Sequence, residues 1–273
     1  IREASDAIVD RMSAMVPNLS AKTRVLDLGS GYGGSMRRIV KTFGCRASCL
    51  NLSEVQNDTN RLKTRRAGLT SQIDVLHGTF EAIPDGDASF DVVWSQDALL
   101  HSDQRAQVLG EAWRVLKPGG YFVFTDPCQA DDVPEGVLQP VYDRLQLNSL
   151  GSFGFYREAA LATGFELECQ EDLTEHLRTH YDRVREELKS NYDSLRSKGV
   201  SARYLDDMMI GLEKWVEAAD QGLEILSAQL ALLPPGLDLL DHSREAGVVD
   251  SEHDVPEHGD EAPVGVVGKA GVA

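Results

Sequence analysis

The stretch VLDLGSGYGGSMRRIV, residues 25–40, places four glycines within six residues, directly after an apolar run. The apolar run predicts a buried strand, and the residues after Gly34 are expected to form a helix. A glycine-rich loop between a strand and a helix presents backbone N–H groups at the helix N-terminus, where the polar end of a nucleotide-like ligand can bind. The stretch therefore predicts a strand, a ligand-binding loop and a helix, in this order.

The same alternation of strand and helix extends from the first residues to residue 125. The expected strands cover residues 23–28, 46–51, 73–76, 90–94 and 121–125. Ser53 and Gln56 form a capping box that starts one of the intervening helices. Five strands that alternate with helices predict an α/β fold with a parallel, doubly wound sheet. Its ligand is expected beyond the carboxyl ends of the strands, where the strand order reverses.

Residues 127–156 interrupt this alternation and are expected to form a helical insertion, or lid, after the fifth strand. The elements expected within and after it are helices at about 139–147 and 156–163, a sixth strand at 165–170, and two long helices at about 174–197 and 201–219. The domain is expected to cover residues 1–217. Residues 218–273 hold eleven acidic residues and show no clear apolar seventh strand, so this segment is expected to be partly disordered.

The charge of the chain restricts its partners. With 44 acidic and 27 basic residues, the net charge is −17, which opposes binding to nucleic acid and to anionic membranes. No apolar run reaches the ~20 residues of a membrane span, and no signal peptide precedes the first helix, so a cytoplasmic location is expected. The four cysteines form no C-x-x-C pair, so reduced thiols and no metal site are expected.

The acidity is combined with a shortage of lysine, since the chain has 19 arginines and 8 lysines. Acid-rich, lysine-poor surfaces stay hydrated in concentrated salt, where repulsion between carboxylates is screened. The composition favours a salt-adapted protein over an ordinary acidic one.

Two ligands compete for the glycine loop. A dinucleotide-binding loop reads G-x-G-x-x-G, and the glycines at 29, 31, 33 and 34 complete that pattern only loosely. Asp27 instead gives D-x-G-x-G, which resembles the first motif of class I methyltransferases that use S-adenosylmethionine, and LKPGG at 116–120 resembles a recurrent turn of these enzymes. The resemblance implies a Rossmann-like methyltransferase sheet with helices on both faces. The alternatives are a nicotinamide dehydrogenase, which the loop spacing disfavours, and glycines that only form a tight turn.

Several longer segments resemble sarcosine/dimethylglycine N-methyltransferases. They are IREAS at 1–5, LDLGSGYGG at 26–34, CLNLSEVQN at 49–57, WSQDALLHS at 94–102 and GSFGFYRE at 151–158. These enzymes form glycine betaine, a compatible solute, by successive methylation of an amino acid nitrogen. The resemblance implies that methyl groups pass from S-adenosylmethionine to sarcosine and dimethylglycine, with S-adenosylhomocysteine as the product. It also agrees with a salt-adapted surface.

The resemblance also assigns cofactor-binding residues. Gly29, Ser30 and Gly31, preceded by Asp27, are expected to line the methionine portion of S-adenosylmethionine. Asn51 is expected at the ribose hydroxyls, where an amide can replace the usual acidic residue. The other expected contacts are Leu52 and Gln56 near Asn51, Thr79 and Phe80 at the adenine, and Gln96 near the transferred methyl group. Phe80 could equally be a core residue.

Asp97 and His101 are the expected catalytic pair. They are four residues apart, so on a helical turn they would share one face at the carboxyl end of the fourth strand. In the related phosphoethanolamine methyltransferases, an equivalent D-x-x-x-H supports ammonium binding and amine deprotonation. The same pattern here implies that Asp97 binds the substrate ammonium and that the pair accepts or relays its proton. A hydrogen-bonded structural histidine is the alternative.

An amino-acid substrate also needs a partner for its carboxylate, and arginine suits that role. Arg144 and Arg157 lie in or just after the insertion. Arg157 is favoured, because Tyr156 beside it could form an aromatic wall against the methylated ammonium. Either arginine could instead form a surface ion pair.

The expected partner is a small amine or amino acid, and the chain is expected to be a monomer or a homodimer. The alternatives left open are another small-molecule methyltransferase, with a phosphoethanolamine, phenolic or sterol acceptor, and a noncatalytic fragment that binds S-adenosylmethionine. The chain begins at Ile1, without the aromatic-rich N-terminal segment of the enzymes it resembles, so a truncated N-terminus is expected.

Overall fold

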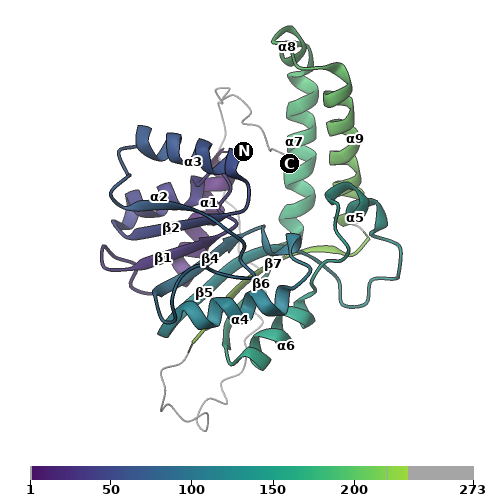
Figure 1. Ribbon diagram of the computed structural model, residues 1–273. Coiled ribbons are helices and arrows are strands. Elements are labelled where there is room, and N and C mark those ends of the chain that lie inside the picture. The colour runs from purple at the N-terminus through teal and green to yellow at the C-terminus, as the bar shows by residue number, and fades with distance from the viewer. Residues whose placement is uncertain (1, 220, 233–273) are drawn as a thin grey trace, which may run out of the picture. The chain divides into compact units, whose positions relative to one another are not determined.

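The computed structural model describes residues 2–219 and 221–232 (Figure 1). A seven-stranded sheet forms its centre. The strands are β1 (Arg24–Leu28), β2 (Arg46–Asn51), β3 (Ile73–His77), β4 (Phe90–Gln96), β5 (Leu116–Gln129), β6 (Glu166–Asp172) and β7 (Leu223–Ala231). Among the described residues, no helix is both long and apolar enough to cross a membrane.

The strand order is β3-β2-β1-β4-β5-β7-β6, so the order reverses between β1 and β4. The strands from β1 to β5 pair in parallel, and β7 pairs antiparallel with both β5 and β6. The predicted doubly wound α/β sheet is thus confirmed. It places the carboxyl ends of β1 and β4 side by side, which is where a ligand is expected in such a fold.

The seventh strand was missed from the sequence. β7 inserts between β5 and β6, and its residues Leu223, Leu226 and Leu230 are buried. The segment 218–273 is acidic as a whole, although the short stretch at 223–232 is mainly apolar. The sheet therefore extends past residue 217, and the part of that segment from residue 233 onward lies outside the described residues.

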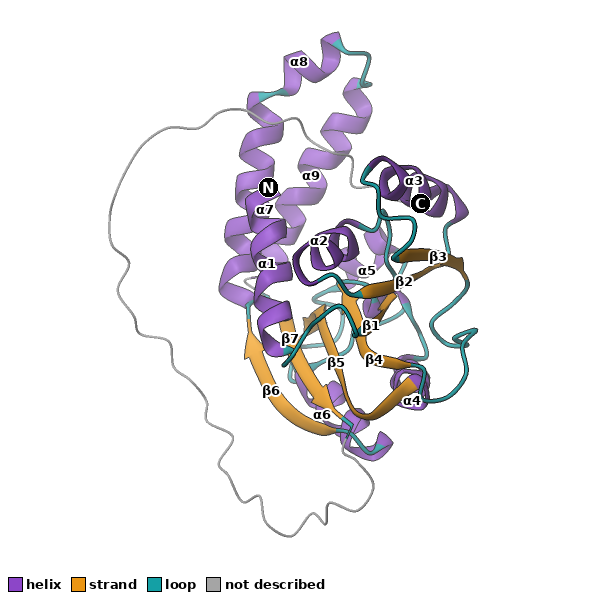
Figure 2. Ribbon diagram, turned by 90° about the vertical axis from the view of Figure 1, so that its left-hand side faces the viewer, coloured by secondary structure: helices purple, strands orange, loops and turns teal. Residues whose placement is uncertain are grey.

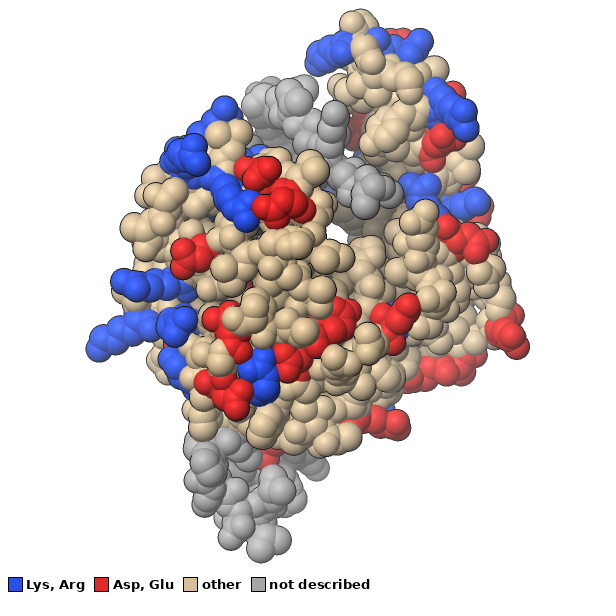
Figure 3. All heavy atoms as spheres, viewed as in Figure 1, with Lys and Arg blue, Asp and Glu red and all other residues tan. Residues whose placement is uncertain are grey.

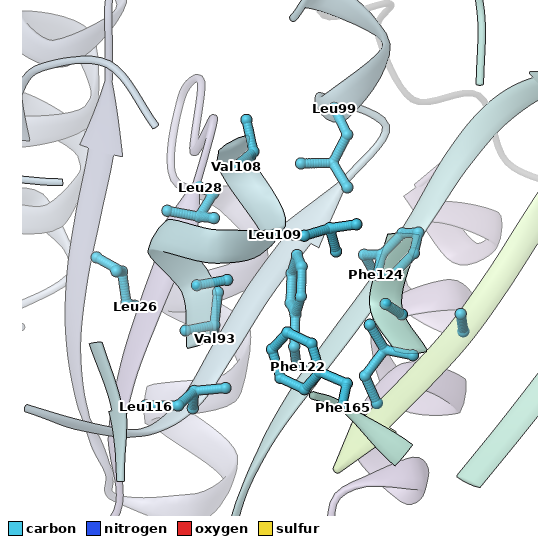
Figure 4. Close-up of a cluster of buried hydrophobic side chains, with 14 of the residues drawn as sticks. Leu26, Leu28, Val93, Leu99, Val108, Leu109, Leu116, Phe122, Phe124 and Phe165 are labelled. Carbon is cyan, nitrogen blue, oxygen red and sulfur yellow. The ribbon is translucent and has the colours of Figure 1, made fainter. Parts of the chain in front are cut away.

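Helices cover both faces of the sheet (Figure 2). The helices on one face are α1 (Arg2–Met15), α2 (Gly34–Phe43) and α3 (Glu54–Arg66), and those on the other are α4 (Arg105–Val115) and α6 (Phe153–Thr163). Phe122 and Phe124 of β5 lie 5.0 Å apart between ring centroids in the larger core cluster, beside Leu109 of α4 (Figure 4). This packing fixes the strand ends that carry the site.

A helical arm, defined here as α7 (Thr174–Ser190), α8 (Tyr192–Ser197) and α9 (Ala202–Ala219), connects β6 to β7. Because β6 runs parallel to β1–β5, α7 leaves the sheet at its carboxyl edge, and α9 returns there (Figure 1). The short helix α5 (Gln139–Leu145) packs against α9 at the base of the arm. The predicted helices at about 139–147 and 201–219 are confirmed as α5 and α9, whereas the one predicted at about 174–197 is divided at Asn191 into α7 and α8.

Candidate functional site

The loop of residues 29–34, called the glycine loop below, has a backbone that only glycine adopts readily. Gly29, Gly31 and Gly33 have φ angles of 77°, 51° and 68°. A Cβ at Gly29 would lie 2.4 Å from the Ala98 Cβ, and one at Gly33 would lie 2.1 Å from an Asn60 oxygen. A Cβ at Gly31 would meet nothing within 4 Å. The loop is therefore tightly packed at both ends and open at its centre.

The glycine loop is tied to the end of β2. The backbone N–H groups of Gly29 and Ser30 donate to the Leu50 carbonyl at 2.9 and 3.1 Å, and the Gly31 N–H donates to Asn51 Oδ1 at 3.3 Å. Asn51 Nδ2 in turn donates to Gln56 Oε1 at 3.1 Å. The structure thus brings together the expected cofactor residues from two strand ends.

Two expected cofactor residues turn their side chains to the buried side of the glycine loop. The Ser30 hydroxyl oxygen is buried beside the Cys49 thiol. Asp27 is 3% exposed, and burial raises the pKa of its carboxyl to about 7. Both side chains therefore support the loop, and any contact of Ser30 with a ligand would come from its backbone.

Three further expected cofactor residues follow the ends of β2 and β3. Leu52, expected near Asn51, is 64% exposed although it is apolar, and Thr79, expected at the adenine, is also exposed. Phe80 packs partly against the larger core cluster, and its Cε1 lies 3.7 Å from where a Cβ on Gly29 would be. Its packing matches the core interpretation, while its partial exposure leaves it accessible to a ligand.

The end of β4 is linked to the start of α2, because the Ser35 hydroxyl donates to Gln96 Oε1 at 2.8 Å. Gln96 therefore lies next to the glycine loop. The next residue, Asp97, has a φ of 51° and ends the strand. A 3₁₀ turn, η1 (Leu99–His101), begins only two residues later. The prediction that Asp97 and His101 share one helical turn is wrong, because the left-handed backbone at Asp97 lies outside any helix.

Asp97 is held by β5. Its N–H donates to the Thr125 carbonyl, and the Thr125 hydroxyl donates to Asp97 Oδ1, each at 2.8 Å. The side chain remains exposed, yet surrounding protein crowds the carboxyl enough for burial to raise its pKa. A reachable carboxylate in such surroundings can attract a cation.

His101 has a different electrostatic partner from Asp97. Burial, and then the positive charge of Arg105, lower the pKa of His101. Arg105 is buried and donates to the Leu100 carbonyl at 3.0 Å, so it also supports the 3₁₀ turn. The imidazole whose charge influences Asp97 belongs to His180 of α7. This charge partly offsets the rise that burial causes in the pKa of the Asp97 carboxyl.

The residues His180, Tyr181 and Trp215 were missed from the sequence. The Tyr181 ring stacks on Trp215 of α9 with centroids 4.7 Å apart, and these two residues are called the aromatic pair below. Tyr181 also meets His180 edge-on at 5.2 Å. Burial lowers the pKa of His180 and raises that of Tyr181, and the Asp97 carboxylate is a smaller influence that acts upward on both. The available signal was a pair of ring residues in an otherwise strongly charged helix, but only the path of the chain brings that helix to Asp97.

Tyr156 does not form the expected aromatic wall. It is 3% exposed, and its hydroxyl donates to Asp126 Oδ2 at 2.6 Å. Asp126 is fully buried, accepts from the Leu100 N–H at 3.0 Å, and has a pKa raised to about 8 by burial. Tyr156 and Asp126 therefore support the start of the 3₁₀ turn from its buried side and do not line an open site.

The two candidate arginines lie in different places. Arg157 is exposed on α6, which packs against α4 and β6. Arg144, on α5, places its guanidinium against Gly211 of α9, where a Cβ would lie 1.6 Å from Nη1. Burial raises the pKa of Tyr181, and the charge of Arg144 partly offsets that rise. The structure thus places Arg144, the arginine that was less favoured from the sequence, on the face of α9 that also carries Trp215, the partner of Tyr181.

Acidic and basic side chains are both scattered over the face of the molecule seen in Figure 3. Figure 1 shows that the helical arm stands at the carboxyl edge of the sheet. Within the described part of the chain, no group of three or more His, Cys, Asp or Glu side chains is arranged to hold a metal ion. The site therefore consists of a glycine loop, an accessible carboxylate and an aromatic pair.

Comparison with known proteins agrees with this geometry. A family model described as a methyltransferase domain matches residues 26–124. The sarcosine/dimethylglycine N-methyltransferase of Aphanothece halophytica is 48% identical over 222 residues, which are 81% of this chain and 80% of that protein. The protein of the same name from Halorhodospira halochloris is 46% identical over 81% of this chain and 79% of its own.

Among solved structures, a candidate sarcosine dimethylglycine methyltransferase from Galdieria sulphuraria superposes with a TM-score of 0.79. It is 35% identical in sequence, and the match covers 84% of this chain and 86% of that one.

Proposed function

Because the chain belongs to the sarcosine/dimethylglycine N-methyltransferase family, we propose that it methylates the nitrogen of sarcosine and of dimethylglycine, so that glycine betaine is formed. The enzyme is an S-adenosylmethionine-dependent N-methyltransferase. The observation that carries the choice of an amine acceptor is the accessible carboxylate of Asp97, one residue from Gln96 and next to the glycine loop.

The residues around the glycine loop fit S-adenosylmethionine. The space in front of Gly31 is open, and the exposed Leu52 and the partly exposed Phe80 offer apolar surface of the kind that an adenine needs. The Asn51 carboxamide oxygen, which accepts from Gly31, keeps a second lone pair for a ribose hydroxyl. When bound, S-adenosylmethionine supplies an electrophilic methyl group on a sulfonium and leaves as S-adenosylhomocysteine.

The N-terminus of α2 adds a favourable potential for the methionine carboxylate. The first turn of α2 carries no acidic residue, and its N-cap, Gly33, offers no side chain that would cap the first N–H groups. These donors and the helix dipole favour a negative group at this end. The methionine portion would therefore lie along the glycine loop with its carboxylate toward α2.

The acceptor amine must be bound and deprotonated before it attacks. Asp97 attracts the ammonium form, and its raised pKa brings its basicity closer to that of an amine. His101 is exposed and has a pKa below the usual 6.5, so its neutral form predominates at pH 7 and can accept a proton. Alignment of the amine with the methyl group supplies most of the acceleration, so no covalent intermediate is needed.

The acceptor carboxylate is proposed to bind Arg144, because this guanidinium lies on the same side of the site as Asp97 and the aromatic pair. The proposed product also accounts for the composition. A net charge of −17 with few lysines suits a protein that works in concentrated salt, and a betaine-forming enzyme protects such a cell osmotically. We also propose that the enzyme works in the cytoplasm, that it uses no metal, and that it is a monomer or a homodimer.

A panel of acceptors tests the proposal. The purified chain is incubated with methyl-labelled S-adenosylmethionine and, separately, with glycine, sarcosine, dimethylglycine, phosphoethanolamine and a phenol. Sarcosine and dimethylglycine are expected to react best, and mass spectrometry should identify glycine betaine. The Asp97→Asn variant, which keeps the size of the side chain but loses its charge, should lose most of this activity while retaining affinity for S-adenosylmethionine.

Other outcomes separate the alternatives. If the phenol or phosphoethanolamine reacts best, the proposed acceptor is wrong while the methyltransferase class stands. If no acceptor reacts although calorimetry detects binding of S-adenosylmethionine, the chain acts as a binding module. If calorimetry detects NAD and not S-adenosylmethionine, the assignment of the glycine loop itself is wrong.

A further inference from the structure

We propose that Tyr181 of α7 contacts the acceptor, and that the acceptor lies across its ring between Asp97 at the ammonium end and Arg144 at the carboxylate end. The inference rests on the proposed function, because it takes the acceptor to be an amino acid. It adds a residue from the helical arm to a site otherwise built at the strand ends.

The packing of the arm brings Tyr181 toward Asp97. Leu100, three residues after Asp97, belongs to the same apolar cluster as Leu177 of α7 and Trp215 of α9, and Tyr181 packs against this cluster. Leu177 and Tyr181 are four residues apart on α7 and therefore lie on the same face. The contact between Leu100 and the arm thus joins the loop of Asp97 to the face that carries Tyr181.

The carboxylate end of the proposed acceptor site is formed by α9 and Arg144. Gly211 and Trp215 are four residues apart on α9, so they lie on one face. The Arg144 guanidinium packs on Gly211, its Nη1 donates to the Asp207 carbonyl at 3.4 Å, and Trp215 stacks on Tyr181. A residue larger than glycine at 211 would displace the guanidinium, so the side chain of Arg144 has a defined seat beside the aromatic pair.

Two opposite charges act on Tyr181. Burial raises the pKa of its phenol most, the Asp97 carboxylate raises it further, and the Arg144 guanidinium lowers it. An amino acid presents the complementary pattern, with an ammonium and a carboxylate separated by one carbon. Trp215 is 8% exposed and supports the ring from behind, while Tyr181 itself remains partly exposed. The arrangement matches a small zwitterion.

An aromatic surface suits an amine whose methyl groups increase in number. Each methylation removes an N–H donor, so a site that relied on hydrogen bonds alone would weaken with every step. Attraction between a cation and an aromatic face does not require N–H groups and tolerates methyl groups. Tyr181 is therefore expected to matter for dimethylglycine, whose cation has a single N–H to donate.

Replacement of Tyr181 by Leu and by Phe tests this role. Tyr181→Leu keeps an apolar side chain on Trp215 but removes the aromatic face, so the KM for dimethylglycine should rise about three- to thirtyfold. Tyr181→Phe keeps the face, so its KM should stay within about twofold of wild type. Calorimetry with S-adenosylmethionine should give the wild-type Kd for both variants. Tyr204→Leu, at an exposed tyrosine of α9, is the matched control and should leave the KM unchanged.

The variant Arg144→Gln tests the carboxylate end without disturbing the aromatic pair. Its KM for dimethylglycine should rise at least about tenfold, while its KM for dimethylethanolamine, which lacks the carboxylate, should stay within about twofold of wild type. Because Arg144 is exposed, this measurement remains available if Tyr181→Leu fails to fold.

The controls distinguish the inference from the proposed function. If wild-type enzyme does not methylate sarcosine or dimethylglycine, both are wrong. If it does, a wild-type KM for folded Tyr181→Leu, or an equal effect of Arg144→Gln on both acceptors, overturns the inference alone.

Discussion

Replacing Gly29 and Gly31 by alanine, one at a time, should separate the structural role of the glycine loop from its binding role. Both residues have positive φ angles, so either alanine strains the backbone by about 1–2 kcal/mol. Only at Gly29 would the new Cβ collide with a neighbour, 2.4 Å from the Ala98 Cβ, and such overpacking costs a further ~1–3 kcal/mol. Gly29→Ala should therefore lower the free energy of unfolding by about 2–5 kcal/mol, and Gly31→Ala by about 1–2 kcal/mol.

Thermal unfolding and calorimetry provide the two readouts. At about 2–4 °C per kcal/mol, Gly29→Ala should lower the Tm by about 4–20 °C and Gly31→Ala by only about 2–8 °C. The methyl group of Gly31→Ala would instead enter the open space where the cofactor is proposed to bind, so the Kd for S-adenosylmethionine should rise about tenfold. Equal losses of Tm would refute the contact between Gly29 and Ala98. A wild-type Kd for Gly31→Ala would exclude the loop from the cofactor site.

Three further predictions concern buried and titrating groups. Tyr156→Phe removes the hydroxyl that donates to Asp126, so urea unfolding should show a loss of about 1–3 kcal/mol in the free energy of unfolding. The variant should also lower kcat, because Asp126 supports the 3₁₀ turn, and a wild-type kcat would contradict that link. The buried Asp27 has a pKa of about 7 against 3.8 in the unfolded chain, so stability should fall as pH rises from about 4 to 7. Asp27→Asn should flatten that decline in stability, and an unchanged decline would show that other groups cause it. Activity should rise with pH as the amine is freed, and His101→Ala should lower kcat more than affinity for S-adenosylmethionine; equal losses would make His101 a structural residue.

The local features of the sequence predicted most of the cofactor half of the molecule. Periodic apolar residues, the glycine loop and the capping box at Ser53 all act within a few residues, so the positions of β1–β4 and the start of α3 after Ser53 agree with expectation. Each of these features is decided by contacts between an element and its immediate neighbours. The match to family segments added the reaction class.

The acceptor half depends on contacts between distant segments. Tyr156 follows Ser152 at the start of a helix and gives no local sign that its hydroxyl will reach a buried Asp126 thirty residues earlier. Tyr181 comes near Asp97 only because β6 runs parallel to β5 and delivers α7 to the carboxyl edge. The strand β7, which was missed from the sequence, lies between β5 and β6 and receives the chain from α9. Neither arrangement leaves a local signal at Tyr181.

The helical arm can be regarded as a greatly enlarged hairpin loop. β6 and β7 are antiparallel neighbours, and at the base of the arm the Leu173 N–H donates to the Ile225 carbonyl at 2.9 Å, as across an ordinary hairpin. The entropy of closing a loop rises only slowly with its length, so residues can be added or removed at the α8 tip at little thermodynamic cost. The acceptor side of the enzyme can thus diverge in length and sequence while the sheet keeps its register. The turn between α8 and α9 is accordingly the place in the described chain to insert a fluorescent reporter or a fused domain.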